Sequence, residues 1–173
     1  MALNNLVRAA VFCALAIAVG FALMMVPNVE LITVTVFISG LTLGWKWGAL
    51  VGGTAIFVYS GMNPLGSGLS FPPLFFMQIF GMALIGSFGG LLRPLFFVEK
   101  MNLFTFFGLA LVGFLSTFTY DALTMISYPI SAGLGIPGIV AALIKGLGFT
   151  LLHEISNAVI FVTAVPLVVK HLK

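Results

Sequence analysis

Charged side chains are scarce in this chain of 173 residues, where Asp, Glu, Lys and Arg together make up only 6%. An ordinary soluble domain is roughly one-quarter charged. Hydrophobic residues account for 61% of the chain, so it has too few charges to cover a surface that faces water. The deficit excludes a soluble domain of usual composition and predicts an integral membrane protein.

Cysteine and recognisable catalytic motifs are also nearly missing. Cys13 is the single cysteine, which excludes an intrachain disulfide and a multi-cysteine metal site. There is no HExxH motif, and His153 and His171 are far apart, so we expect no metal site. The sequence shows no recognisable pair of a catalytic nucleophile and a general base, and it contains no GxxxxGK[ST] loop. We therefore expect no enzyme activity, no cofactor and no ATP hydrolysis by this chain itself.

The chain instead contains a series of apolar runs separated by Pro, Gly, Asn and charge clusters. At about 20 residues per spanning helix, a single domain of this length accommodates about six crossings. The sequence predicts an all-α bundle of six transmembrane helices, near 5–25, 30–44, 47–60, 72–97, 104–128 and 138–168. Trp45-Lys46-Trp47, between the second and third, is typical of an interfacial anchor. The alternative is five crossings, with 30–60 as one bent helix.

Basic residues indicate the orientation, because Lys and Arg favour cytoplasmic segments. With six crossings and the N-terminus inside, six of the 7 basic residues become cytoplasmic: Arg8, Lys46, Arg93, Lys100, Lys170 and Lys173. The outer segments near 27–30, 60–71 and 129–137 contain none. The asymmetry favours six crossings with both termini cytoplasmic, in the cytoplasmic membrane. Basic residues scattered singly give no indication of nucleic-acid binding.

Polar residues inside the last two apolar runs are candidates for a site, because ionisable groups at membrane depth are costly. Asp121 and Lys145 each lie about seven residues, or roughly 10 Å, from the intervening outer segment. We expect them to reach the same depth and to pair, either as a structural clasp or as part of a ligand site. His153 and Asn157, one turn apart, suit a polar lining, although a histidine satisfied in a packed core is an equal alternative.

Small and aromatic residues form the remaining patterns. Ala10, Ala14 and Ala18 are spaced four apart, as are Gly44, Gly48 and Gly52, and such stripes allow helices to approach closely. They indicate either internal packing or docking onto a partner membrane subunit. Several aromatic residues lie near the outer segments and suit a flat organic ligand with polar edges: Tyr59, Phe71, Phe75, Phe76, Tyr120 and Tyr128.

Taken together, several of these features resemble the S component of energy-coupling factor (ECF) transporters. They are the alanine stripe, the six-span plan, the Pro27-Asn28-Val29-Glu30 segment, and the Asn63-Pro64-Leu65-Gly66 segment leading to Gln78 and Gly81. The resemblance covers essentially the whole chain. It implies a receptor for a vitamin or related micronutrient that works with a transmembrane coupling subunit and two cytoplasmic ATPases. It also implies that Ala10, Ala14 and Ala18 form the docking face.

The same resemblance implies a set of substrate-binding residues on the outer side. They are Asn28, Glu30, Asn63, Gln78, Tyr120, Asp121 and Lys145, to which the polar lining of the last helix adds His153 and Asn157. The identity of the substrate does not carry over from the family. Two other functions stay open: a structural scaffold resembling the rod-shape protein MreD, which should lack an outer polar cavity, and a stand-alone carrier, which should show a polar lane through every depth.

Overall fold

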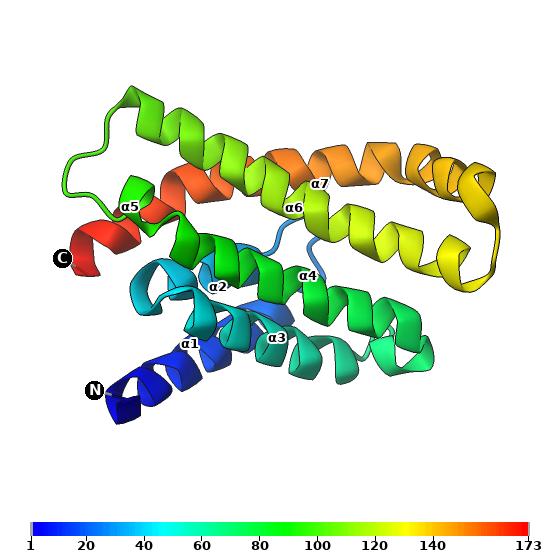
Figure 1. Ribbon diagram of the computed structural model, residues 1–173, viewed down its shortest axis with the longest axis horizontal. Helices are drawn as coiled ribbons and strands as arrows, with labels where there is room; N and C mark the ends of the chain where they lie inside the picture. Colours follow the sequence, from blue (N-terminus) through cyan, green and yellow to red (C-terminus); the bar gives the residue numbers. More distant parts are fainter. Residues whose placement is uncertain (1, 173) are drawn as a thin grey trace.

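The computed structural model describes residues 2–172, and all of its regular elements within that range are helices (Figure 1). In chain order they are α1 (Ala2–Leu23), α2 (Ile32–Leu43), α3 (Trp45–Gly61), a 3-10 turn η1 (Gly68–Ser70), α4 (Pro72–Leu91), α5 (Arg93–Phe96), α6 (Leu103–Ser131) and α7 (Gly135–Leu172). The expectation of an all-α chain is confirmed.

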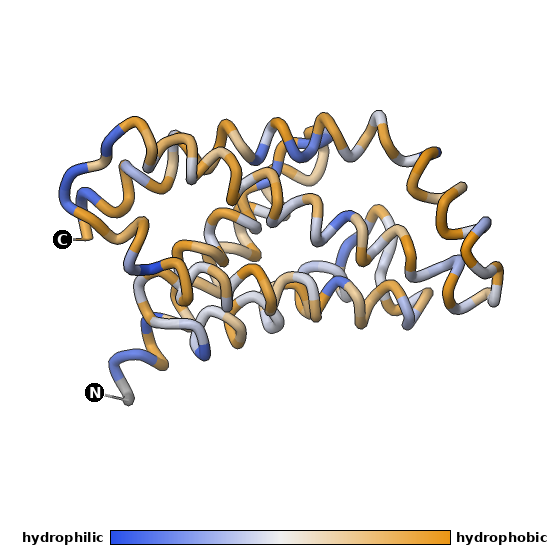
Figure 2. The backbone as a smooth tube through the Cα atoms, turned by 45° about the horizontal axis from the view of Figure 1, so that its top comes forward, coloured by the Kyte–Doolittle hydropathy of each residue, from blue (hydrophilic) through white to orange (hydrophobic). Residues whose placement is uncertain are grey.

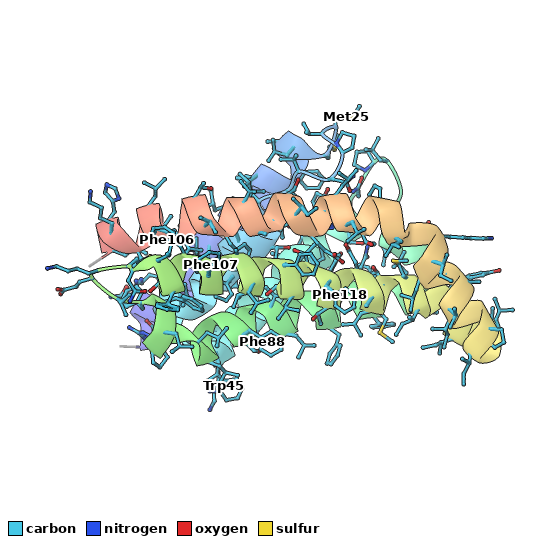
Figure 3. The ribbon with its side chains drawn as sticks, turned by 90° about the horizontal axis from the view of Figure 1, so that it is seen from above. Met25, Trp45, Phe88, Phe106, Phe107 and Phe118 are labelled. Atoms are coloured by element: carbon cyan, nitrogen blue, oxygen red, sulfur yellow. The ribbon has the colours of Figure 1, made fainter. Side chains whose placement is uncertain are left out.

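Four of the described helices, α1, α4, α6 and α7, are long and apolar enough to cross a membrane. Helix α2 is apolar but has only 12 residues, and α3 has 17. Large apolar side chains cover the outside of the bundle, and Figure 3 shows Met25 and Trp45, 72% and 51% exposed, projecting from it. These features fit a multi-pass membrane protein, while six crossings and the orientation of the termini stay predictions.

Helices α2 and α3 form an antiparallel hairpin, so the alternative of one bent helix over 30–60 is wrong. Gly44 separates them with a φ of +94°, a conformation that favours glycine. Farther along the pair, Gly48 faces Gly40, and Gly52 faces Val36. The predicted break beside Trp45 is confirmed.

Two other predicted boundaries differ from the structure. The expected helix 72–97 is divided, because α4 ends at Leu91 and Pro94, which has no backbone N–H to donate, lies in the first turn of the short α5. The expected outer segment 129–137 shrinks to a short turn, because α6 extends through Pro129 to Ser131 and α7 begins at Gly135.

Helix α2 lies at the centre of the bundle, and every residue from Ile32 to Thr42 is buried. It contacts α1, α3, α4 and α7. The Phe37 ring packs 5.0 Å from the Phe161 ring and 6.4 Å from the Phe96 ring, measured between centroids. We call the region around Phe37, Phe96 and Phe161 the packed half of the bundle.

Glycines let three helices meet closely in the packed half. A Cβ atom at Gly48 of α3 would collide with the backbone carbonyl of Gly86 in α4, and one at Gly40 of α2 would meet the same carbonyl. The stripe of Gly48 and Gly52 is therefore internal packing, as one of the two interpretations of the sequence predicted.

Both chain ends lie at the same end of the molecule, together with α5 and the connection that leads to α6 (Figure 1). Figure 2 shows hydrophilic segments at this end and long hydrophobic stretches along the helices. Helix α1, which carries Arg8, begins here, α5 with Arg93 lies here, and α7 ends here just after Lys170. Lys145 lies far from this end of α7, and the orientation of the bundle in the membrane stays a prediction.

Candidate functional site

The candidate site lies beside the first turn of α2, which is a short helix. Twelve helical residues span about 18 Å, whereas the hydrocarbon core of a bilayer is about 30 Å thick. The α1–α2 connection, residues 24–31, consequently lies at the middle of the molecule and not at its end (Figure 1). Non-helical backbone at membrane depth is tolerated where it is buried in protein or lines a cavity. Several residues of this connection are exposed, but Asn28 and Glu30 each bury one side-chain oxygen.

Glu30 of the connection is fixed by the start of α2. Its Oε2 accepts a hydrogen bond of 2.9 Å from the backbone N–H of Thr33, in the first turn. A carboxylate here satisfies a free N–H and interacts favourably with the helix dipole. Asn28 has a φ of +58°, which asparagine tolerates better than most residues, and this turns the chain toward the bundle. One Glu30 oxygen, Oε2, is thereby hydrogen-bonded to α2, and the other, Oε1, makes no hydrogen bond to the helix.

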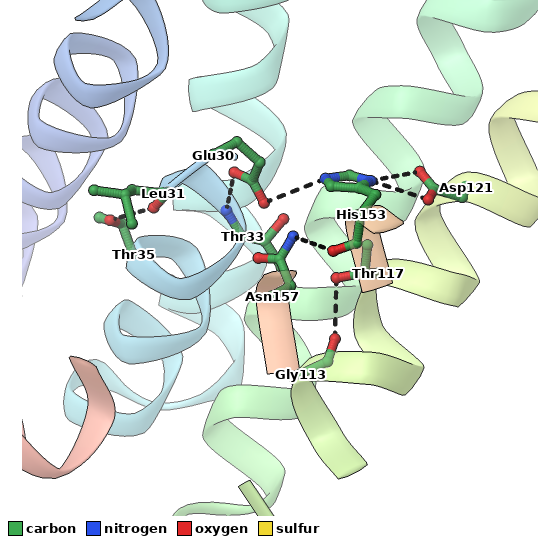
Figure 4. A network of polar contacts seen from close by, with 9 residues as sticks. All are labelled: Glu30, Leu31, Thr33, Thr35, Gly113, Thr117, Asp121, His153 and Asn157. Carbon is green, nitrogen blue, oxygen red and sulfur yellow. Dashed lines mark hydrogen bonds and ion pairs between the residues drawn. The ribbon is translucent and has the colours of Figure 1, made fainter. Parts of the chain in front are cut away.

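His153 of α7 lies between two carboxylates from different elements (Figure 4). Its Nδ1 is 3.0 and 3.1 Å from the two oxygens of Asp121 in α6. A carboxylate only accepts, so Nδ1 carries the hydrogen and donates it. On the other side of the ring, Nε2 is 3.9 Å from Glu30 Oε1, an ion-pair distance that is too long for a hydrogen bond. Asp121 therefore orients the imidazole, and its second nitrogen faces Glu30.

Asn157 lies one turn farther along α7 and is fully buried. Its Nδ2 donates to the backbone carbonyl of His153 over 3.3 Å, while its Oδ1 has no donor. Glu30 Oε1 and Asn28 Oδ1 are likewise buried without a hydrogen-bond donor. Buried polar atoms are nearly always paired, because each unpaired one costs free energy. Three such acceptors lie close together in this region, which we call the polar half. The protein alone does not provide hydrogen-bond donors for them.

A cavity of about 120 Å³ lies against these groups. Its walls come from the end of α1, the α1–α2 connection, α3 and α7: Gly20, Leu23, Met24, Val26, Asn28, Val29, Glu30, Tyr59, Phe149 and His153. Two aromatic rings, two acceptor side chains and a histidine thus border one space, which is open on one side because Phe149 and Val26 are exposed. Such a mixture of apolar walls and a few convergent polar groups is typical of a small-molecule site.

The remaining predicted polar residues surround this cavity without lining it. The Tyr59 side chain interacts with Asn63, and the Tyr120 side chain interacts with Gln78. Gln78 also accepts a hydrogen bond from the Ser60 hydroxyl. Asn63 Oδ1 accepts from the backbone N–H of Leu65 over 2.9 Å, which shapes the α3–α4 connection. Among these residues, Asn63 supports the aromatic wall of the cavity through its interaction with Tyr59.

Lys145 lies apart from the site, and its expected pairing with Asp121 is wrong. Lys145 is exposed, while Asp121 contacts His153. The reason is the register of α6 and α7, since Gly113 packs against Asn157 and Phe161 and this sets Asp121 level with His153. The prediction assumed a straight hairpin, but Figure 3 shows the first part of α7 bending away from the rest of the helix.

Sequence reasoning did not include two cavity residues, Tyr59 and Phe149, in the substrate-binding set. Tyr59 was recognised only as one of several aromatic residues near the outer segments. Phe149 had a usable signal, since it precedes His153 by four residues and so lies on nearly the same face of α7.

The alanine stripe is on the outside of the molecule. Ala10, Ala14 and Ala18 are all exposed, whereas Ala9 and Ala16 of the same helix are buried. An apolar groove of about 420 Å³ runs between α1 and α3 and includes Ala10 and Ala14 in its wall. The stripe is thus available to a neighbouring helix.

Comparison with known proteins adds no relative: no protein-family model, curated protein or solved structure matches this chain.

Proposed function

We propose that this chain is the substrate-binding membrane subunit of an ECF-type importer, which binds a vitamin or related micronutrient from the outer side. The observation that carries the proposal is the cavity beside Glu30 and His153, whose buried acceptor oxygens have no donor within the protein. A ligand that supplies donors would satisfy them. On this proposal both termini are cytoplasmic, and the polar half faces outward.

The cavity favours a receptor over a structural scaffold. A scaffold needs helix surfaces for its partners but has no need for unpaired acceptors inside the bundle, which lower its stability. The stabilising device of a scaffold would be a satisfied polar network or an apolar core. In this chain the Asp121–His153 contact is satisfied, but the groups beyond it, Glu30 Oε1 and Asn28 Oδ1, are not.

The packed half argues against a stand-alone channel or carrier. Beyond Asn157, the buried residues of α7 are Phe161, Val165 and Val169, and all are apolar. Phe37 and Leu41 of α2 fill the same region and are fully buried. Along this part of the described chain a polar lane does not continue, so substrate release requires a larger rearrangement. An ECF coupling subunit and two cytoplasmic ATPases would supply the energy for it.

The exposed alanine stripe is the proposed docking face for the coupling subunit. Small side chains at Ala10, Ala14 and Ala18 would let a partner helix pack closely against α1. We expect Ala14→Leu to abolish uptake in cells that contain the transporter while substrate binding is unchanged. Ala141→Leu, at an exposed alanine of α7, is the matched control and should keep both. Loss of substrate binding in Ala14→Leu would show that the stripe is internal packing.

The receptor function is tested by native mass spectrometry of the purified, full-length chain. We expect an additional mass from a retained small molecule, which Glu30→Gln and His153→Ala lose. Lys145→Ala, on the same helix as His153, is the control and should retain it. A correctly folded chain that never retains a small molecule, and is stabilised by none from a membrane-free cell extract, would contradict the proposal.

A further inference from the structure

The unpaired atoms of the polar half are all hydrogen-bond acceptors. They are Asn28 Oδ1, Glu30 Oε1 and Asn157 Oδ1, of which the first two belong to residues that line the cavity. A ligand that completes the site must therefore bring N–H or O–H groups and not further acceptors.

His153 adds to this preference. Since Nδ1 donates to Asp121, the neutral ring presents Nε2 to the cavity as another acceptor. The gap of 3.9 Å between Nε2 and Glu30 Oε1 is too long for a direct hydrogen bond. Because Glu30 Oε1 is buried, a donor group of the ligand bonds both atoms only after the Glu30 carboxylate turns toward the cavity. When the ring is neutral, the two side chains thus form an acceptor pair on one wall of the cavity.

The charged groups that surround the cavity are acidic. Glu30 lines the cavity and Asp121 lies directly behind the His153 ring, while the walls include neither Lys nor Arg among the described residues. Lys145, the nearest basic residue along α7, is exposed outside the site. Two carboxylates and one imidazole leave the site negative even when the ring is protonated. An anionic ligand would be repelled, and a cationic one attracted.

The shape and walls of the cavity limit the size of the ligand. A volume of about 120 Å³ compares with the roughly 150 Å³ cavity that holds benzene in an engineered protein. Tyr59 and Phe149 contribute aromatic rings to the walls, and an organic cation that lies over the face of such a ring is attracted to it. The cavity therefore fits one small ring or a short amine, and any larger remainder of the ligand extends past Val26 at the exposed side.

A metal ion fits this site poorly. His153 is held between Glu30 and Asp121 on opposite sides of its ring, so the two carboxylates do not converge on one point. Across residues 2–172 no three His, Cys, Asp or Glu side chains are grouped to hold a metal. The acceptors are instead spread along a wall, as they would be for an organic molecule with several donors.

Resting on the proposed receptor function, we infer that the substrate carries a cationic, nitrogen-rich group with several N–H donors, such as an amidinium, an amine or a protonated aminoheterocycle. This group enters the cavity between Glu30 and His153. Its donors satisfy Glu30 Oε1, Asn28 Oδ1 and His153 Nε2, and its ring or chain packs against Tyr59 and Phe149. The inference specifies a substrate class that the resemblance to S components leaves open.

The test is isothermal titration calorimetry of the full-length chain in detergent, after any retained molecule is removed, with four probes that share one phenyl ring. Benzamidine carries a cation with N–H donors, and phenyltrimethylammonium carries a cation without donors. Benzyl alcohol is neutral, and benzoate is an anion. We expect benzamidine to bind most tightly, and Glu30→Gln to weaken it about 10- to 100-fold, as expected for hydrogen bonds to a charged group. Lys145→Ala should leave its affinity unchanged.

The other outcomes separate this inference from the proposed function. Tightest binding of benzoate or benzyl alcohol, or an affinity for benzamidine that is unaffected by Glu30→Gln, overturns the cationic class but leaves a receptor. If phenyltrimethylammonium equals benzamidine, the requirement for N–H donors is wrong. If no probe binds, the cationic class is rejected for this cavity, and native mass spectrometry of the untreated chain decides the receptor function separately. A retained neutral or anionic molecule would then support the receptor function and reject the cationic substrate class.

Discussion

The packed half and the polar half of this bundle share helices but differ in how they satisfy buried polar groups. In the packed half, Ser39 donates to the carbonyl of Val36 and Thr42 to that of Ile38, both within α2, and rings fill the remaining space. In the polar half, buried oxygens of Glu30 and Asn28 have no donor. Helix α7 passes through both halves. The difference therefore arises beside the start of α2, and on the proposed receptor function the packed half stabilises the fold while the polar half binds the substrate.

The largest expected effect is on the packed half. Phe161 is fully buried against Phe37, so Phe161→Ala would leave a cavity and lower the free energy of unfolding by about 3–5 kcal/mol. Thermal unfolding in detergent measures the loss. Phe107→Ala, at a side chain 67% exposed, is the control and should change little. Equal effects of the two substitutions would mean that the packed half does not carry the stability.

A second substitution tests the close approach of the helices. Gly48→Ala places a Cβ against the Gly86 carbonyl, and we expect a loss of about 1–3 kcal/mol in the free energy of unfolding because the backbones must separate. The matched control is Gly53→Ala on the same helix, where the new Cβ would be 3.7 Å from Ile79. Similar unfolding temperatures for both variants would refute this packing.

In the polar half, two substitutions of Glu30 separate its structural role from its role in binding. Glu30→Gln keeps an oxygen that accepts from the Thr33 N–H, so stability should be almost unchanged while ligand affinity falls. Glu30→Ala also removes this bond, and we expect a further loss of about 1 kcal/mol in unfolding free energy. Thermal unfolding and ligand titration of both variants measure the two effects. Equal destabilisation by Gln and Ala would show that the charge, and not the hydrogen bond, fixes α2.

The smallest effect is expected at Lys145, which lies outside both halves. Lys145→Ala should alter neither unfolding temperature nor ligand affinity, because the side chain is exposed and Asp121 contacts His153 in its place. Asp121→Asn is the informative partner, since it should weaken ligand binding by disturbing the orientation of His153. If Lys145→Ala weakened ligand binding as much as Asp121→Asn, the predicted pairing of Asp121 with Lys145 would be supported.

The apolar runs predicted most of the fold, because runs of this length in a chain with so few charges can only be buried or face lipid. A break between the second and third helices was predicted at Trp45-Lys46, whereas the structure places it at Gly44, so that Trp45 already belongs to α3. The division between α4 and α5 at Leu92 was missed, although Pro94 was a local signal for it.

The candidate site was predicted in part. Glu30, Asn28 and His153, three of the residues predicted to bind substrate, line the cavity, and their role in binding stays a prediction. The partner of Asp121 was wrong because the register of α6 against α7 depends on the contact of Gly113 with Phe161, which spacing along the chain does not encode. The depth of the α1–α2 connection was also hidden, since it depends on α2 being central and short.

The most direct test of the central claim is an experimental structure of the protein purified with its bound small molecule. We predict density in the cavity between Glu30 and His153, against the Tyr59 ring, with the packed half unchanged. The account would be contradicted if the cavity were closed by a direct hydrogen bond between His153 Nε2 and Glu30 Oε1, with the small molecule elsewhere.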